Sequence, residues 1–333
     1  MHRRTFVSAL PAMLAVAHGL STTQAQEATP AANGTQPDGS WAFTDDRGRT
    51  VHLPEMPTRI FADAGAGLAL WELGIKPVGL VGYESVFEIP DELADVPFLD
   101  LSAGEPDIEA ILEIDPDISI SQAWDASNPN DFAGFDETSW PGFTDIAPTL
   151  SILAVVVPVE HALQRFEELA AALGADLTAP EIVSDRDAFE SAREDLRAAA
   201  AEKPDLTVMA MSATPESVWI GNPESASDLR TFLELGVNIL VPDTPGAAMS
   251  GLWQEVSWEE IINYPVDLYL NDDRGYALTN EEVLEQPLFS LMPAAQAGQI
   301  GTWTIEYVPS FGSLTPILNA LAASIRDAEV VTG

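Results

Sequence analysis

The sequence predicts an α/β protein made of two similar lobes, each with a parallel sheet, joined by a single long helix. Strand and helix patterns alternate from Trp41 onward, which is typical of parallel α/β folds. A segment of the first half also aligns without a gap onto a segment of the second half, at an offset of 150 residues. Finally, apolar residues over 182–201 predict a helix long enough to connect two lobes. Two such lobes form a cleft, where ligands usually bind.

Capping and breaking residues set the elements of the first half. A short helix ends at Gly74, and residues 77–81 continue as a strand. Asp107 is expected to cap the next helix, which stops before Pro116, and residues 117–121 form the following strand.

The middle of the chain carries two helix patterns in succession. Apolar side chains over 159–173 recur at i, i+3, i+4 and i+7, which predicts an amphipathic helix ending at Gly174. The second helix, over 182–201, is stopped by Lys203 and Pro204, and a strand is expected at 206–211.

The internal repeat divides the chain into lobes. Residues 107–121 align onto 257–271, and each copy reads as a capped helix, a turn with proline, an aspartate and a short strand. Convergence on a common local pattern is the alternative explanation. The predicted parts are an N-terminal lobe at 41–177, a linking helix at 178–204 and a C-terminal lobe at 205–333.

The N-terminus is predicted to be a signal peptide over residues 1–25. A basic start is followed by an apolar stretch broken by Pro11 and by a small-residue cleavage site at 23–25. Residues 3–7, Arg-Arg-Thr-Phe-Val, are similar to a twin-arginine export signal, and an ordinary secretory signal is the alternative. The apolar run is too short for a membrane anchor, and residues 26–40 are expected to form a flexible leader.

Charge and cysteine content exclude several classes of protein. There are 14 Lys+Arg and 53 Asp+Glu, and removal of the signal peptide leaves 12 basic residues and a net charge of −41. Such a chain repels polyphosphates, which excludes nucleic acid as a partner. The absence of cysteine excludes disulfides, thiol catalysis and a lipoprotein anchor. We therefore expect a monomer without a lipid anchor, in the periplasm or at the extracytoplasmic face of the envelope.

Several segments together resemble one known family, the iron-siderophore and cobalamin substrate-binding proteins of ABC importers. The resemblance extends over residues 43–328, and the segments that carry it are 43–51, 53–60, 73–79, 105–120 and 294–300. It implies two Rossmann-like lobes joined by a rigid helix, with limited closure on the ligand. It also implies no catalysis, and the chain has no nucleophile elbow, P-loop or dinucleotide fingerprint.

The function that the resemblance implies is capture of a ferric siderophore and its delivery to an ABC permease dimer with its ATPase. A haem- or cobalamin-binding protein of the same family is an alternative. An alternative of another class is an adhesion or scaffold protein with a degenerate cleft.

Histidine content bears on the form in which iron would be bound. His2 and His18 lie in the predicted signal peptide, and neither His52 nor His161 has a partner at metal-ligand spacing. We therefore expect no bare metal site and no cofactor, so that iron would arrive inside a chelator.

Candidate ligand-binding residues are aromatic side chains near strand ends, because parallel α/β lobes meet ligands at the carboxyl ends of their strands. For each of them the alternative role is packing in a core. The candidates are Tyr83, Trp124, Trp140, Trp219, Trp303 and Tyr307.

Arg274 is the basic candidate, because it follows the predicted strand 267–271. The resemblance implies that an arginine here faces the chelate oxygens through charge-assisted hydrogen bonds. The alternative is a local salt bridge to Asp272 or Asp273.

The ligand class is predicted from charge. A ferric tris-catecholate is a trianion, and uncompensated like charge weakens binding in a partly dry pocket, so a neutral or cationic tris-hydroxamate is favoured. One feature departs from this expectation. Hydroxamate-binding relatives often carry an arginine just after the first-lobe strand, where this chain has residues 121–124, Ser-Gln-Ala-Trp.

Glu109 and Glu259 occupy the same position in the two copies of the repeat. The resemblance implies that one glutamate per lobe docks onto arginines of the two permease subunits. The alternative is a carboxylate favoured by the dipole at a helix N-terminus. Glu260 is the better capping-box partner for Ser257, which leaves Glu259 available.

Overall fold

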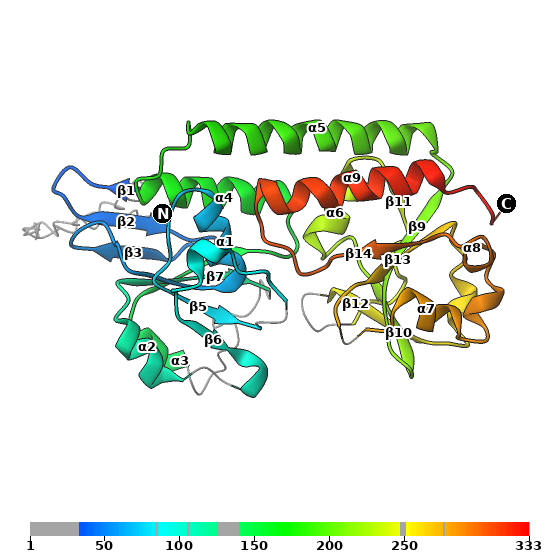
Figure 1. Ribbon diagram of the computed structural model, residues 1–333, viewed down its shortest axis with the longest axis horizontal. Coiled ribbons are helices and arrows are strands. Elements are labelled where there is room, and N and C mark those ends of the chain that lie inside the picture. Colours follow the sequence, from blue (N-terminus) through cyan, green and yellow to red (C-terminus); the bar gives the residue numbers. More distant parts are fainter. Residues whose placement is uncertain are drawn as a thin grey trace, which may run out of the picture. The chain divides into compact units, whose positions relative to one another are not determined.

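The computed structural model describes residues 33–83, 86–104, 107–124, 140–246, 251–275 and 277–332. These residues belong to one compact unit, and the predicted signal peptide lies outside them. Within the unit, two larger sheets lie beneath a long helix, and a small antiparallel sheet lies at the N-terminal end (Figure 1). The predicted two-lobe α/β fold is confirmed.

The N-terminal lobe contains a five-stranded sheet in the order β6-β5-β4-β7-β8, with every neighbouring pair parallel. Its strands are β4 (Ile60–Asp63), β5 (Gly79–Gly82), β6 (Phe98–Asp100), β7 (Ile118–Ala123) and β8 (Thr149–Leu153). Its helices are α1 (Ala64–Glu72), α2 (Ile108–Ile114), α3 (Trp140–Thr144) and α4 (Val159–Ala172), with short 3-10 turns η1 (Asp91–Leu93) and η2 (Leu101–Ala103). Asp107 caps α2 as predicted, because its side chain accepts a hydrogen bond from the Glu109 amide.

The C-terminal lobe contains a sheet in the order β12-β10-β9-β13-β14, with β11 paired to β9. Its strands are β9 (Thr207–Ala213), β10 (Ser217–Gly221), β11 (Asn238–Ile239), β12 (Trp253–Ser257), β13 (Leu268–Asp272) and β14 (Ile300–Trp303). Its helices are α6 (Ser227–Glu234), α7 (Asn280–Leu284), α8 (Pro293–Gln296) and α9 (Phe311–Asp327), with 3-10 turns η4 (Ile261–Asn263) and η5 (Phe289–Leu291).

This second sheet is mixed, whereas the sequence predicted a parallel one. β10 runs antiparallel to both β9 and β12. The connection from β9 to β10 is a short turn in which Thr214 binds Ser217. A connection that short can only form a hairpin, because a parallel pair needs a crossover of a dozen or more residues.

The internal repeat is visible in the strand pairing. The pairs β5–β4, β4–β7 and β7–β8 of the first sheet correspond to β11–β9, β9–β13 and β13–β14 of the second, and all of them are parallel. Asp117 and Asp267 occupy equivalent positions, and both accept hydrogen bonds from backbone amides. Asp117 accepts from the amides of Thr58 and Arg59, and Asp267 accepts from the amide of Thr207.

The linking helix is α5 (Pro180–Glu202), which runs alongside α4 and α9 over both lobes (Figure 1). Pro180 stands in its first turn, where a missing amide hydrogen costs nothing. Ile182 belongs to the core of the N-terminal lobe, whereas Phe189 and Leu196 belong to the core of the C-terminal lobe. No helix in the described residues is long and apolar enough to cross a membrane.

A three-stranded antiparallel sheet precedes the first lobe. It consists of β1 (Gly34–Thr35), β2 (Trp41–Thr44) and β3 (Thr50–Leu53). Residues 34–40 were expected in a flexible leader, but β1 pairs with β2 and the turn between them is hydrogen-bonded. The buried Trp41 holds this sheet to α4, because its indole N–H donates to the Ala172 carbonyl at 2.7 Å.

The start of the second repeat copy differs from the prediction. The sequence predicted a helix after Ser257, but the structure has a turn followed by η4. The capping box itself is confirmed. The Ser257 amide donates to the Glu260 carboxylate at 3.0 Å, and the Glu260 amide donates to the Ser257 hydroxyl at 3.3 Å. The sequence predicted neither α3 nor β8.

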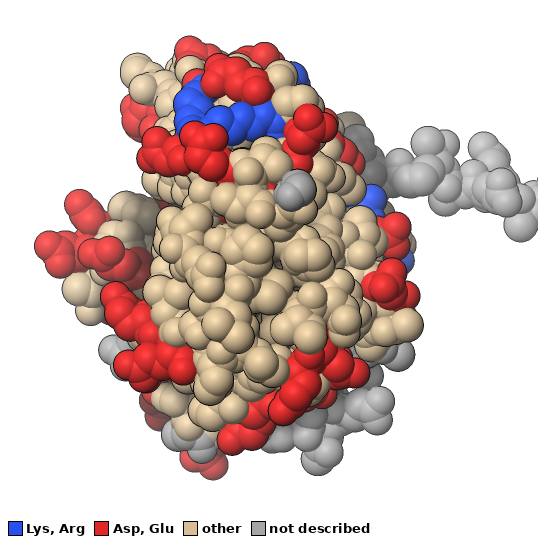
Figure 2. Space-filling model, turned by 90° about the vertical axis from the view of Figure 1, so that its right-hand side faces the viewer, with Lys and Arg blue, Asp and Glu red and all other residues tan. Residues whose placement is uncertain are grey.

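Scarce positive charge is used at helix ends. Figure 2 shows an outer end of the molecule with a broad uncharged centre, carboxylates around it, and lysine and arginine gathered near the top. At the ends of α5 and α9, Lys203 donates to the carbonyls of Arg326 and Ala328, and Arg326 pairs with Asp195 at 2.8 Å. Cations at these positions stabilise the carbonyl ends of helices.

The repeat supplies a matched pair of substitutions for stability. The carboxylate of Asp267 is fully buried and accepts from Thr207, Val331 and Thr332 through five hydrogen bonds, whereas Asp117 is only partly buried. We expect Asp267→Ala to lower the free energy of unfolding by roughly 3–5 kcal/mol, because five hydrogen bonds to a buried carboxylate are lost, and Asp117→Ala to lower it by about 1–2 kcal/mol. Chemical denaturation at pH 7 measures both, and equal losses would contradict this account.

Candidate ligand site at the carboxyl edges of the sheets

The carboxyl edge of the first sheet meets the C-terminal lobe at a short segment. Ala154 follows the end of β8, and its carbonyl accepts from the Ser227 hydroxyl at 2.8 Å. The Val156 amide donates to the Ser225 carbonyl at 2.7 Å, and Val155 forms a β-bridge with Ala226. Val156 has a φ of 59°, which a β-branched residue adopts only when its surroundings hold it there.

The carboxyl edge of the second sheet reaches the same segment through Asp228. Trp303 is the last residue of β14, and its indole N–H donates to the Asp228 carboxylate at 2.6 Å. Residues 225–228 therefore connect the edges of the two sheets at which ligands meet this type of fold.

Asp228 is buried at this junction. Burial raises the pKa of its carboxyl from 3.8 to about 6, although hydrogen bonds from Trp303 and from the Leu229 amide oppose the shift. The same charge contributes, after burial, to the raised pKa of the Tyr307 hydroxyl. The junction is thus a low-dielectric region that contains an ionisable group.

Aromatic side chains gather on one face of the second sheet near its carboxyl edge. Trp219 on β10 is level with Ser212 on β9, and Trp253 on β12 is level with Gly221. Side chains opposite each other in neighbouring strands share a face, so both tryptophans lie on the Ser212 side of the sheet. Both are partly exposed.

Trp303 lies beside this pair but is itself enclosed. The centre of its ring is 5.4 Å from the centre of the Trp253 ring, and the two rings meet edge-on. A Cβ atom at Gly221 would lie 2.7 Å from the Trp303 ring, so only glycine fits beneath it. The enclosed tryptophan therefore supports the partly exposed one.

Arg274 is held by carboxylates of its own lobe. Its Nε and Nη2 donate to Asp272 at 2.9 and 2.6 Å, and Nη1 donates to Glu306 at 2.9 Å. The guanidinium also lies 6.0 Å from the centre of the Trp253 ring. The salt bridge to Asp272, which was the alternative role for Arg274, is present. The Arg274 side chain is 16% exposed. A ligand reaching Arg274 would meet a cation that is already neutralised.

The carboxyl edge of the first sheet presents Tyr83 after β5 and Trp124 after β7. Tyr83 is 50% exposed and Trp124 is partly exposed. Between them Asp63 ends β4 and caps α1, accepting from the amides of Ala66 and Gln122. Burial raises the pKa of the Asp63 carboxyl to about 6, against the effect of those hydrogen bonds.

The remaining predicted ligand residues have other surroundings. Trp303 and Tyr307 are 1% and 8% exposed and belong to the core of the C-terminal lobe, which is the packing role. Trp140 opens α3, and its side chain lies outside the described residues. Trp253 was missed because no strand was predicted over 253–257. Its place opposite Gly221 exists only once the β10–β12 pair forms.

The predicted docking residues are both exposed. Glu109 lies in the first turn of α2, and Glu259 lies in the turn that precedes η4. Within the described residues neither carboxylate has a hydrogen bond or an ion pair. Glu260, by contrast, is occupied by the capping box with Ser257.

His52 and His161 have different surroundings. His52 is exposed on β3. His161 lies on α4, its Nε2 is 3.0 Å from an Asp46 oxygen, and Arg165 binds the other oxygen at 2.6 Å. Among the residues that the structure describes, no group of three or more His, Asp or Glu is arranged to hold a metal ion.

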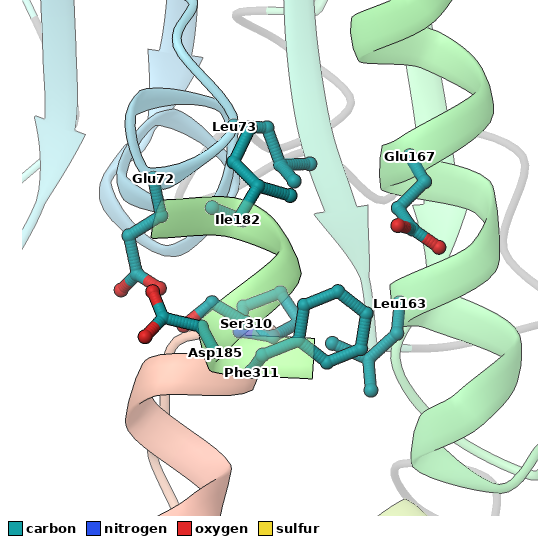
Figure 3. Close-up of a pocket in the computed structure, with 10 residues that line it drawn as sticks. Glu72, Leu73, Leu163, Glu167, Ile182, Asp185, Ser310 and Phe311 are labelled. Carbon is teal, nitrogen blue, oxygen red and sulfur yellow. The ribbon is translucent and has the colours of Figure 1, made fainter. Parts of the chain in front are cut away.

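A small pocket lies where α1, α4, α5 and α9 meet (Figure 3). Its volume is about 10 Å³, which is near the minimum for a single water and far below what a siderophore needs. In Figure 3 the carboxylates of Glu72 and Asp185 point toward each other beside Ser310. Burial, and after it Asp185, raise the pKa of the Glu72 carboxyl, while bonds from Ser310 and the Gly312 amide lower it. Glu72 thereby ties α1 to the N-terminus of α9.

Comparison with known proteins identifies the type of molecule. Residues 100–307 match the model of a family described as periplasmic binding protein. Among curated protein sequences, none matched the chain. Many solved structures match it, and one of them reaches 30% identity.

That structure is DesE, a ferric-siderophore receptor protein from Streptomyces coelicolor, which covers 87% of this chain and 99% of its own at a TM-score of 0.78. The petrobactin-binding protein YclQ from Bacillus subtilis is 20% identical, covering 86% of this chain and 99% of its own with a TM-score of 0.61. The catecholate-siderophore binding protein VctP from Vibrio cholerae is 16% identical, covering 86% of this chain and 99% of its own with the same TM-score. The last two show a shared fold.

The buried carboxyl at the junction predicts a pH dependence of stability. The folded protein holds the Asp228 proton more tightly than the unfolded chain, so this group stabilises the fold below pH 4 and loses that effect as the pH rises from about 4 to about 6. We expect the difference in unfolding free energy between wild type and Asp228→Asn to change by up to about 3 kcal/mol over that range.

Chemical denaturation at several pH values measures this difference. Asp95→Asn is the control, because Lys76 lowers the pKa of the exposed Asp95 carboxyl and the dependence should have the opposite sign. A difference between wild type and Asp228→Asn that stays constant with pH would refute the assignment.

Proposed function

This chain belongs to the periplasmic binding protein family, and on that premise we propose that it captures a ferric siderophore outside the cytoplasmic membrane and delivers it to an ABC importer. Members of this family bind substrates and are not enzymes. The similarity to a ferric-siderophore receptor, extending over 99% of that receptor's length, supports the substrate class. Export through the twin-arginine route, without a lipid anchor, completes the proposal.

One structural observation carries the proposed site. Trp219, Trp253 and Arg274 lie on one face of the second sheet near its carboxyl edge, and Tyr83 and Trp124 follow strands of the first sheet. Partly exposed aromatic rings offer flat apolar surface to the aliphatic parts of a chelator at a small entropic cost. Trp303 supports Trp253 from the core.

The charge balance favours a chelate without net negative charge. Each of the 12 basic residues outside the predicted signal peptide already interacts with another group of the protein. An anionic chelate at Arg274 would therefore compete with Asp272 and Glu306 and meet their repulsion. A neutral or cationic ferric tris-hydroxamate avoids this cost.

Delivery is proposed to use Glu109 and Glu259. Their carboxylates are exposed and equivalent in the internal repeat, as docking onto two like permease subunits requires. Each would meet an arginine of the permease through a charge-assisted hydrogen bond.

The ligand proposal is tested by titrating the purified protein with ferrichrome, ferrioxamine B and ferric enterobactin while following tryptophan fluorescence. We expect the tris-hydroxamates to bind more tightly than the tris-catecholate, and Trp219→Ala and Trp253→Ala each to weaken binding by about tenfold or more. Trp71→Ala is the matched control, because Trp71 is also partly exposed but lies at the far end of α1 from the carboxyl edge. Tighter binding of ferric enterobactin at moderate salt would overturn the ligand class.

The docking proposal is tested with Glu109→Ala combined with Glu259→Ala. We expect this double variant to bind the chelate like wild type and to lose most iron uptake in cells that contain the authentic permease. Glu113→Ala, which removes an exposed carboxylate from the next turn of α2, should change little. Uptake at the wild-type rate by the double variant would refute the docking role.

A further inference from the structure

Two exposed aliphatic side chains lie beside the two glutamates. Leu112 on α2 is 55% exposed and Ile262 on η4 is 51% exposed. Single exposed apolar residues are ordinary and by themselves indicate nothing. These two, however, are separated by the same 150 residues as Glu109 and Glu259, so they occupy equivalent positions in the repeat.

The exposure of these residues is a property of the repeat and survives a change of local structure. The segment is an α-helix in the first lobe and a turn followed by a 3-10 helix in the second. Nevertheless, the preceding residues Ile111 and Ile261 are both fully buried, and the following residues Glu113 and Asn263 are both exposed. Each lobe thus anchors one isoleucine in its core and presents the next aliphatic side chain to the outside.

The pair in the first lobe forms a small mixed patch. Leu112 lies three residues after Glu109, which places the two on neighbouring positions of one helix face. The second lobe keeps the same spacing from Glu259 to Ile262. An apolar centre next to an unpaired carboxylate matches the usual anatomy of a binding interface, in which apolar anchors provide affinity and charges set register.

We propose that Leu112 and Ile262 are the apolar anchors with which the two lobes seat on a two-fold symmetric permease dimer, each side chain entering a socket beside the basic residue that receives the neighbouring glutamate. This proposal rests on the proposed function and adds to it the residues that supply affinity.

The occupant follows from symmetry and charge. Equivalent patches on two lobes fit two equivalent surfaces, which a dimer of like subunits presents. A second copy of this chain without its predicted signal peptide would bring another net charge of −41 against exposed carboxylates, and an anionic lipid surface would be repelled in the same way. A membrane protein with basic and apolar sockets remains as the matching partner.

The test measures uptake of radioactive iron by source cells that lack their own copy of the gene and are complemented with variants. Iron is supplied as ferrioxamine B or ferric enterobactin, whichever binds the purified wild-type chain. We expect Leu112→Asn and Ile262→Asn each to lower uptake about tenfold at limiting protein, and the double variant to lower it further. Chelate affinity of the purified variants should stay within about twofold of wild type, because neither residue lies near the aromatic face.

Two controls separate the anchor role from general effects. Leu112→Met with Ile262→Met keeps apolar volume and should restore most uptake. Val183→Asn removes a 37% exposed aliphatic side chain from α5, on the opposite side of the molecule from α2 (Figure 1), and should leave uptake unchanged. Full uptake by the double asparagine variant overturns the anchor proposal alone, whereas a wild-type chain that binds neither chelate or restores no uptake overturns the proposed function with it.

Discussion

The attachment of helix α5 to both lobes is the constraint on which the rest of the structure depends. Its first turn places Ile182 in the N-terminal core, and further along Phe189 packs at 5.5 Å from Phe311 of α9. Arginines reinforce each contact, since Arg186 binds Glu167 of α4 and Arg326 of α9 binds Asp195. A helix fixed at these points joins the cores of the two lobes.

The scarcity of positive charge makes the position of each arginine important for holding the elements together. Acidic side chains outnumber basic ones so heavily that repulsion destabilises the compact state. The few arginines are placed where one guanidinium joins elements far apart in sequence, as Arg165 joins α4 to the loop after β2 through Asp46, and as Arg59 caps the carbonyl end of α2. Positive charge used in this way is not available to a ligand, and the same constraint therefore bears on ligand class.

The sequence predicted the elements whose signals are local, and it missed those that depend on contacts distant in sequence. Capping by Asp107, the amphipathic helix at 159–173 and the capping box at Ser257 were all readable, because each is fixed within a few residues. The pair β10–β12 was not, since its register depends on partners about 35 residues apart. For the same reason the sequence did not predict the position of Trp253. Nor did it predict the burial of Trp303, whose indole N–H donates to Asp228, 75 residues away in sequence. The β9–β10 hairpin was also missed, although its turn is local.

The two copies of the repeat differ in some structural features and share others. The second copy has a turn and a 3-10 helix where the first has helix α2, and its sheet contains a hairpin that the first sheet lacks. The aspartate that joins the central strands stayed in both copies, as Asp117 and Asp267, and so did the alternation of a buried isoleucine with an exposed aliphatic residue. Internal packing explains the retained aspartate and the buried isoleucines. Leu112 and Ile262 are each more than half exposed, so packing among the described residues does not explain why both are apolar, and their equivalence indicates a partner outside the protein.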